Sequence, residues 1–264
     1  MCLIVFDWQP DAEVSLRLAA NRDEFHQRPT RALHRWSDAD LIGGRDLLAG
    51  GTWLAATASR VAALTNVREN QANVRESLTQ TPPGAPSRGE LVRQALTADD
   101  PARWLENLVA QGARQYAGFN LLVMTGGRLW ALHHSRRETV CRRLDPGLHG
   151  LSNASLDTPW PKLLRARNAM QQALSTQDWR AEMWRSLRDT RPAPDSELPD
   201  TGIGRDRERF LSPLFIEGEE YGTRATTLVT VSAGSTALEE QQFGPGGVPT
   251  GNIVRLRANA ADQS

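Results

Sequence analysis

The sequence predicts an α+β protein folded as a four-layer αββα sandwich, in which two antiparallel sheets pack face to face and helices cover both outer faces. Apolar segments of strand length occur in pairs connected by short turns, which is typical of antiparallel hairpins. These pairs alternate along the chain with pairs of segments that have helical periodicity. Because each layer must bury its apolar face against another, the alternation favours stacked sheets with helices outside.

The composition supports one large folded domain. The chain has 264 residues, of which 39% are hydrophobic, and it contains eight tryptophans, so it can bury a sizeable core. We expect residues 1–257 to form a single domain and residues 258–264 to be a flexible tail.

Two hairpins are predicted early in the chain. Residues 2–8 and 14–20 are apolar runs joined by a polar turn that contains Pro10, which predicts a hairpin at the N-terminus. A second pair, 52–58 and 61–67, is separated by only two residues, and so short a connection specifies antiparallel neighbours.

A polar, Pro-rich surface loop is expected between about 68 and 87, before the first pair of helices. Ser87 and Glu90 have the spacing of a capping box, and helical periodicity then continues through residues 101–113.

The third hairpin joins 119–125 to 128–135 through Gly126-Gly127, because glycine supplies the positive φ that such turns need. A second pair of helices is expected from about 159 to 189, with Pro159 suited to a first helical turn.

The last quarter of the chain is predicted to begin with a long loop and to end with strands. Residues 190–222 are rich in Pro, Gly and acidic side chains, as long surface loops are. Strands are expected at 226–233, 237–243 and 252–257.

The charge pattern argues against a nucleic-acid interface. Basic and acidic residues are equal at 31 each, and no stretch dense in Lys or Arg is free of acids, so a small-molecule partner is favoured. Lys162 is the only lysine, which disfavours Schiff-base or lysine-nucleophile chemistry.

The two cysteines, Cys2 and Cys141, are too few for a disulfide framework or a CxxC metal site, which fits a reducing compartment. The start of the chain does not have the pattern of a signal peptide, and no stretch approaches the ~20 apolar residues of a membrane span. We therefore expect a cytoplasmic protein, and the sequence leaves its oligomeric state open.

Cys2 is the first candidate catalytic residue. If the initiator Met is removed, Cys2 supplies both a thiol nucleophile and an α-amine base, and both groups have a pKa near neutrality, at about 8.5 and about 7.7–8.0. The alternative is a chance cysteine at the start of a buried strand.

The polar tetrad Asn21-Arg22-Asp23-Glu24 is expected where the second strand ends, which in a hairpin lies beside Cys2. Arg22 would lower the pKa of the thiol, and Asp23 would hold the α-amine. An Asx turn with a solvated ion pair is the alternative.

Asn66 and Asn153 occupy similar places, each at or just after a predicted strand or glycine-rich turn, and their amides are candidate oxyanion or substrate contacts. Arg224 precedes a predicted strand and is a candidate ligand for a carboxylate or an oxyanion. Turn-capping asparagines and a surface arginine are the alternatives.

No HxxxH or His/Cys cluster is present, so no dedicated metal site is expected. Haem is a candidate bound ligand, with the Cys2 thiolate or a histidine such as His133 on the iron and tryptophans such as Trp53 lining an apolar pocket. A histidine with a structural hydrogen bond is the more common case.

A series of short motifs, in this order, resembles the NRDE family, also called the Transport and Golgi organization protein 2 family. The match extends from residue 2 to about 232, and the shared order is more specific than any single string. The motifs are MCLIVF, LAANRDEF, RP at 28–29, GGTWLA, LTN, RGELV, GFNLL, GLSNA, TPWPKL and YGTR.

This resemblance implies a branch of the cysteine N-terminal-nucleophile (Ntn) hydrolases, related in fold to penicillin V acylase, bile salt hydrolase and acyl-coenzyme A:penicillin acyltransferases. It implies acyl transfer from an amide or thioester, with no cofactor required. The catalytic residues carried over are Cys2, Arg22, Asp23, Asn66, Asn153 and Arg224.

One departure concerns Arg22 and Asp23, which are adjacent here, whereas the relatives place the Arg and Asp a few residues apart. Neighbours in a regular strand face opposite sides, so either a turn begins there or only one of the two reaches Cys2, and Asn21 or Glu24, both candidate ligand contacts, then fills the other role. The family is also associated with moving haem and with acyl-lipid homeostasis, so a haem-trafficking protein without essential catalysis is the second hypothesis, and a scaffold with a filled cleft is the third.

Overall fold

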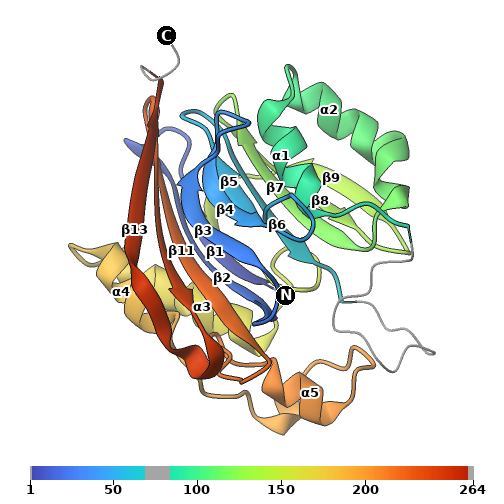
Figure 1. The fold of residues 1–264 in the computed structure, drawn as a ribbon, viewed down its shortest axis with the longest axis vertical. Helices are drawn as coiled ribbons and strands as arrows, with labels where there is room; N and C mark the ends of the chain where they lie inside the picture. The colour runs from blue at the N-terminus through green and yellow to red at the C-terminus, as the bar shows by residue number, and fades with distance from the viewer. Residues whose placement is uncertain (1, 69–83, 261–264) are drawn as a thin grey trace.

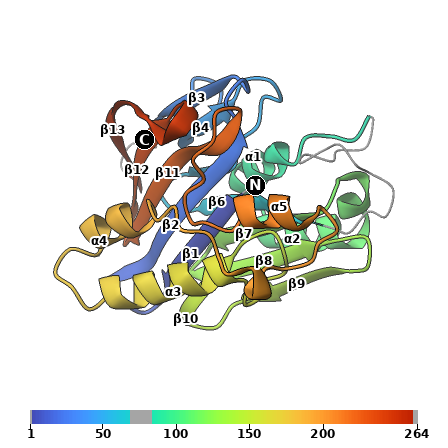
Figure 2. The same ribbon diagram turned by 90° about the horizontal axis from the view of Figure 1, so that it is seen from below.

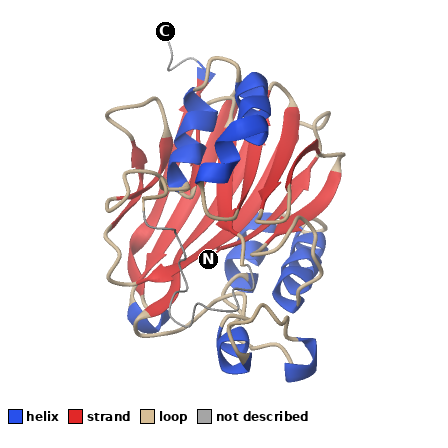
Figure 3. Cartoon of the chain, turned by 90° about the vertical axis from the view of Figure 1, so that its right-hand side faces the viewer, coloured by secondary structure: helices blue, strands red, loops and turns tan. Residues whose placement is uncertain are grey.

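The computed structural model describes residues 2–68 and 84–260. Within these ranges thirteen strands form two antiparallel sheets, and helices lie on the outer face of each sheet (Figure 1). Seen from the side, α1 and α2 cover one sheet (Figure 3), whereas α3 and α4 lie across the other (Figure 2). The predicted four-layer αββα sandwich is therefore confirmed.

The first sheet has six strands in the order β10-β1-β2-β11-β12-β13. Its strands are β1 Cys2–Trp8, β2 Val14–Phe25, β10 Gly147–Leu151, β11 Tyr221–Ser232, β12 Ser235–Phe243 and β13 Pro249–Asn259. The N-terminal hairpin is central in this sheet, because β1 and β2 are both paired on their two edges.

The second sheet has seven strands that follow one another along the chain, in the order β3 to β9. Its strands are β3 Thr30–Arg35, β4 Ile42–Asp46, β5 Leu54–Ala56, β6 Val61–Asn66, β7 Phe119–Thr125, β8 Arg128–His134 and β9 Thr139–Arg143. The predicted turn at Gly126-Gly127 is present, and both glycines have positive φ.

Five α-helices and several short helical turns complete the described structure. They are α1 Gly89–Thr97, α2 Pro101–Asn107, α3 Pro161–Ala173, α4 Trp179–Ser186 and α5 Arg205–Phe210, with the π-helical turn η1 Leu108–Gly112 and the 3₁₀ turns η2 Ala113–Gln115, η3 Asp195–Glu197 and η4 Pro245–Gly247. No helix in these ranges combines the length and the apolar character needed to cross a membrane.

Strand β1 shows how the layers are held together. Its side chains alternate between two cores: Ile4 and Phe6 pack between the sheets, whereas Leu3 and Val5 pack under α3 and α4. Because both faces are buried, the strand is a continuous apolar run, which is why its bounds agree with the predicted residues 2–8.

The prediction for β2 was wrong at its C-terminal end, because the strand continues to Phe25 rather than ending at residue 20. The polar tetrad lies inside the strand and keeps its ladder pairing, since Arg22 is opposite Cys2 and Asp23 is opposite Thr223. Tertiary pairing with β11 on the second edge overrides the local polarity here.

Four strands, β3, β4, β9 and β10, were not predicted. Glycines break the apolar pattern of β4, and close packing explains them: a Cβ on Gly43 would lie 2.7 Å from Ala55 Cβ, and one on Gly44 would lie 2.3 Å from the Trp53 ring. β9 is a largely exposed edge strand without a buried face to give an apolar alternation.

The helix starts differ from the predictions. The predicted capping box is absent, because no side chain caps the N-terminus of α1. Ser87 accepts from the Glu90 N–H through its backbone carbonyl, and the Glu90 carboxylate forms an ion pair with Arg93. Helix α3 begins at Pro161 and not at Pro159.

Two predicted loops and the tail also differ from the structure or fall outside it. The 190–222 segment contains η3 and α5, and β11 begins before it ends. Most of the predicted 68–87 loop lies outside the described residues. Strand β13 continues to Asn259, two residues into the predicted tail, and 261–264 are outside the described residues.

Candidate functional site

Cys2 lies at the rim of a cleft between the ends of the two sheets. It is the first residue of β1, and it pairs with Arg22 of β2, so the two side chains share one face of the sheet. The cleft has a volume of about 330 Å³. It is lined by Cys2, Arg22, Asp23, Glu24, Arg28, Asp46, Leu48, Ala49, Thr52, Trp53, Leu64, Asn66, Ala85, Ser87, Arg88 and Gly89.

The charges around Cys2 act on the thiol in opposite directions. Burial raises the pKa of Cys2, and the Asp23 carboxylate raises it further, whereas Arg22 lowers it. Arg22 is therefore the nearby side chain that favours the thiolate.

Arg22 is held in one orientation by two neighbours. Its guanidinium lies 4.2 Å from the centroid of the Trp53 ring, and Nη1 donates to Thr30 Oγ1 at 3.3 Å. Trp53 was expected as a ligand contact, and it does line the cleft. It therefore forms part of the cleft wall and also supports Arg22.

Asp23 faces the opposite side of β2 from Arg22, yet both reach the cleft because they stand near the end of the strand. Thr223 Oγ1 donates to Asp23 Oδ1 at 2.8 Å, and only 1% of Asp23 is exposed. Burial raises the pKa of Asp23, and Lys162 is the largest opposing influence. Arg22 and Asp23 are adjacent in the chain, and both nevertheless line the cleft.

The structure does not place Asn21 in the cleft. Its Nδ2 donates to the carbonyls of Leu187 and Leu214, at 2.9 and 2.8 Å, and Thr226 Oγ1 donates to its Oδ1 at 2.6 Å. Asn21, expected as a ligand contact, instead connects β2 to β11 and to the segments that follow α4 and α5, because both polar atoms of its amide are hydrogen-bonded.

Asn66 and Asn153 meet, but they do not have the same position. Asn66 lines the cleft, and its side-chain amide makes no hydrogen bond within the described residues. Asn153 is fully buried outside the cleft lining, and its Nδ2 donates to the Asn66 carbonyl at 2.9 Å. Only Asn66 presents free donors to a ligand, and Asn153 fixes its backbone.

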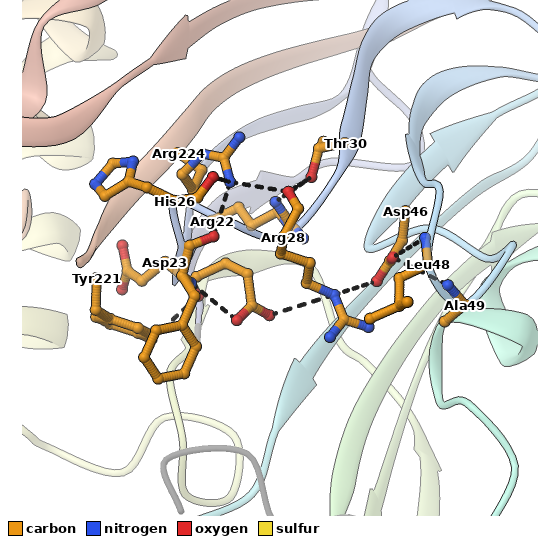
Figure 4. A network of polar contacts seen from close by, with 12 residues as sticks. Arg22, Asp23, His26, Arg28, Thr30, Asp46, Leu48, Ala49, Tyr221 and Arg224 are labelled. Atoms are coloured by element: carbon orange, nitrogen blue, oxygen red, sulfur yellow. Dashed lines mark hydrogen bonds and ion pairs between the residues drawn. The ribbon is translucent and has the colours of Figure 1, made fainter.

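Arg224 is not in the cleft lining either. It is the extra residue of a β-bulge in β11, between the Thr223 and Ala225 pairings. Its Nη1 donates to the carbonyls of Phe25, His26 and Arg28, at 2.8, 3.1 and 3.2 Å (Figure 4). The expected anion ligand instead holds the turn after β2.

That turn carries Arg28 into the cleft wall. Arg28 Nε donates to Asp46 Oδ2 at 2.7 Å and lies 3.9 Å from Glu24 Oε2 (Figure 4). Glu24 thus lies in the lining as expected of a ligand contact, but its carboxylate already faces Arg28.

His133, expected as a ligand contact, is not among the residues that line the cleft. Its Nδ1 donates to Asn120 Oδ1 at 2.7 Å, and Asn120 Nδ2 donates in turn to the Ala154 carbonyl at 2.8 Å. This chain of bonds supports the loop that carries Asn153. Among the described residues, no group of three or more His, Cys, Asp or Glu side chains could hold a metal ion.

Two basic residues near Cys2 were not identified from the sequence. Arg88 lines the cleft and donates to the Gly118 carbonyl at 3.0 Å, and burial lowers the pKa of Arg88 to about 10. Lys162 is buried behind the cleft, and burial lowers the pKa of Lys162 to about 8. The sequence feature that could have drawn attention to Lys162 is that it is the only lysine of the chain.

Comparisons with known proteins agree over most of the chain. A family model described as Transport and Golgi organisation 2 matches residues 1–243. The Transport and Golgi organization protein 2 homolog of Bos taurus is 34% identical over 263 residues, with 88% of this chain and 89% of that protein covered. The Transport and Golgi organization 2 homolog of Mus musculus is 31% identical, with the same coverage, and the Drosophila melanogaster protein is 28% identical, with 88% of each chain covered.

Proposed function

The chain belongs to the Transport and Golgi organisation 2 family, and on that premise we propose that it is a cysteine Ntn hydrolase or acyltransferase. It would act on an amide or thioester bond through Cys2 after removal of Met1. The observation that carries the proposal is the position of Cys2 at the start of β1, in a cleft and directly opposite Arg22.

The first step forms a thioester. The Cys2 thiol gives its proton to the Cys2 amine, and the sulfur attacks the carbonyl carbon of the substrate. The Arg22 guanidinium favours the thiolate, and the free Asn66 amide donates to the oxyanion that develops on the carbonyl oxygen. The amine then returns the proton to the leaving amine or thiol as the carbon–leaving group bond breaks.

The second step removes the acyl group from Cys2. Water, or another acyl acceptor, loses a proton to the same amine and attacks the thioester carbon, which releases the thiol. Asp23 supports both steps by a charged hydrogen bond to the amine. Asn153 and Arg224 support the cleft from outside it, through Asn66 and the turn after β2.

The test compares Cys2→Ala with Cys141→Ala across a panel of amide and thioester substrates. Cys141 is the matched control, since it is the only other cysteine and lies on the edge strand β9. We expect Cys2→Ala to abolish turnover and acyl-enzyme formation, both followed by intact mass, and Cys141→Ala to retain them. Turnover that survives in Cys2→Ala, or an active protein that keeps Met1, would overturn the mechanism.

Haem binding in the same cleft stays the second prediction. It rests on the family resemblance and not on a contact in the structure. Of the two expected iron ligands, only Cys2 lies in the cleft lining, because His133 is bonded to Asn120. A saturable shift in haem absorbance that Cys2→Ala removes would favour it. The cytoplasmic location and a small acyl substrate also stay predictions.

A further inference from the structure

The face of the first sheet that α3 covers carries Asp23 as well as apolar side chains. Leu3, Val5 and Ala19 on this face pack against Leu163 and Ala166 of α3. Asp23 lies on the same face of β2 as Ala19, because the two residues are an even number of positions apart. The first turn of α3, through Leu163, thus packs on the face of the sheet that also carries Asp23.

Lys162 occupies that first turn. Only 3% of it is exposed, and its Nζ has no hydrogen-bond partner within the described residues. Burying an ammonium without a compensating charge costs several kcal/mol. Of the 31 basic residues of the chain, 30 are arginines, and the single lysine is at a buried position.

The charged groups that act on Lys162 come from four different parts of the chain. Asp23 of β2 has the largest favourable effect, followed by Cys2 of β1 and Glu208 of α5, whereas Arg68, after β6, is repulsive. Arg68 forms an ion pair with Glu208, and its guanidinium lies 5.1 Å from the centroid of the Trp160 ring beside α3.

Asp23, Lys162, Arg68 and Glu208 thus form a buried charge cluster, in which Arg68 and Glu208 are in contact and Lys162 and Asp23 act on one another electrostatically. Two carboxylates and two cations make it neutral, and each of its residues is nearly excluded from solvent. Arg68 and Glu208 form an ion pair, and Lys162 has the largest effect among the charged groups that oppose the raised pKa of Asp23.

We propose that Lys162 is a positioning residue that acts through Asp23: its buried ammonium keeps the Asp23 carboxylate ionised, so that Asp23 can hold the Cys2 amine. The last clause rests on the proposed function, whereas the pairing of Lys162 with Asp23 does not.

The coupling has a direction that can be measured. Burial lowers the pKa of Lys162 to about 8, and Asp23 raises it; burial raises the pKa of Asp23, and Lys162 is first among the groups that lower it. As pH rises through about 8, Lys162 becomes neutral and no longer compensates Asp23, so turnover should decline on this side of the pH profile.

The first experiment titrates Lys162 by NMR. Selective ¹³Cε-lysine labelling gives a single resonance, because the chain has one lysine, and no turnover is required. We expect a pKa about two units below that of a free lysine, a further drop of about one unit in Asp23→Asn, and no change in Asp7→Asn, the matched control at the other end of the hairpin. An ordinary lysine pKa, or one that Asp23→Asn leaves in place, overturns the pairing.

The second experiment measures the pH profile of turnover in Lys162→Met and Lys162→Arg, and it covers the case in which Asp23→Asn does not fold. Lys162→Met should shift the acid limb upward by about one pH unit, since Asp23 is then harder to ionise, and Lys162→Arg should restore the limb. An unchanged profile, or an equal loss at every pH in both variants, contradicts the positioning role. If the NMR coupling holds while Cys2→Ala is as active as wild type, the proposed function fails and the pairing stands.

Discussion

At the scale of single residues, Arg22 is the side chain that opposes the raised pKa of the Cys2 thiol. It is opposite Cys2 in the β1–β2 pairing, and Trp53 and Thr30 hold its guanidinium from two sides. Because its position is fixed before any ligand arrives, it opposes the raised pKa of Cys2 without rearrangement.

Arg22→Met should therefore raise the pKa of the Cys2 thiol by about one unit or more. The measurement is the pH dependence of alkylation by iodoacetamide, resolved for each cysteine by mass spectrometry. Cys141 is the reference within the same molecule, because burial raises the pKa of Cys141 to about 11. Arg17→Met is the control on the same strand, and an equal shift in both variants would contradict the role of Arg22.

At the scale of elements, the loop after β10 places Asn153 against Asn66. It is closed by Asp157, whose carboxylate accepts from His149 Nδ1 and from the Gly150 N–H, both at 2.8 Å. Asp157 has a φ of 60°, which asparagine and aspartate tolerate better than most residues. The position of Asn153 thus depends on a short ion pair one turn away.

This pair should contribute most to stability at mildly acid pH. The hydrogen bond to Asp157 raises the pKa of His149, although burial lowers it. The stability that His149 contributes is therefore fully present below about pH 6.5 and is lost as pH rises through the pKa of His149 in the folded protein. Burial raises the pKa of Asp157, but the hydrogen bonds from His149 and Gly150 outweigh burial and lower it. The stability that Asp157 contributes is therefore lost as pH falls below about 4. The pair is most stabilising between these limits.

Asp157→Asn keeps the backbone conformation and removes the charge. Compared with wild type, its free energy of unfolding from urea titrations should be reduced most between about pH 4 and 6.5, and the difference should shrink toward neutral pH. A difference that is the same at every pH would show that the ion pair is not its cause. Asp178→Asn, which changes the cap residue of α4, is the matched control without a histidine partner.

At the scale of the whole molecule, one buried carboxylate connects the two sheets. Glu240 of β12 accepts from the Leu33 N–H of β3 at 2.7 Å and from Thr227 Oγ1 at 3.0 Å. It is 2% exposed, and burial raises the pKa of Glu240 against the effect of these hydrogen bonds. The sheets thus share a buried polar contact next to the apolar core between them.

Glu240→Ala should destabilise the protein by about 2–4 kcal/mol, since it leaves buried donors of both sheets without acceptors. Glu240→Gln should cost less, because its amide oxygen can still accept from Leu33. Glu239→Ala, one residue earlier and on the other face of β12, is the control for a surface ion pair. Equal urea midpoints for Glu240→Ala and Glu239→Ala would contradict this connection.

How far the sequence predicts this molecule depends on where each signal originates. Strand β1 and the Gly126-Gly127 hairpin were predicted because burial and turn geometry appear directly in local sequence. The extension of β2 through the polar tetrad was not, because its ladder partner on β11 is about 200 residues away in the chain.

The candidate site shows the same division. Residue type, expected position in the strands and the family resemblance together selected Cys2, Arg22, Asp23 and Asn66, and the structure brings all four to the cleft. Sequence could not separate residues that face the cleft from those that support it from behind, because an amide or guanidinium serves either purpose. Asn21, Asn153, Arg224 and His133 differ from the first group only in direction and partners.

The burial of Lys162 has a practical consequence for handling the protein. The chain has no other lysine, so the folded molecule presents no accessible ε-amine. Amine-reactive dyes, cross-linkers and surface-coupling chemistry would therefore react at the chain terminus, and under the proposed removal of Met1 that terminus would be Cys2 itself. A fluorophore or sensor surface attached by amine coupling would be uniform in orientation and would block the cleft, so immobilisation for ligand binding calls for an engineered tag at the opposite end of the chain.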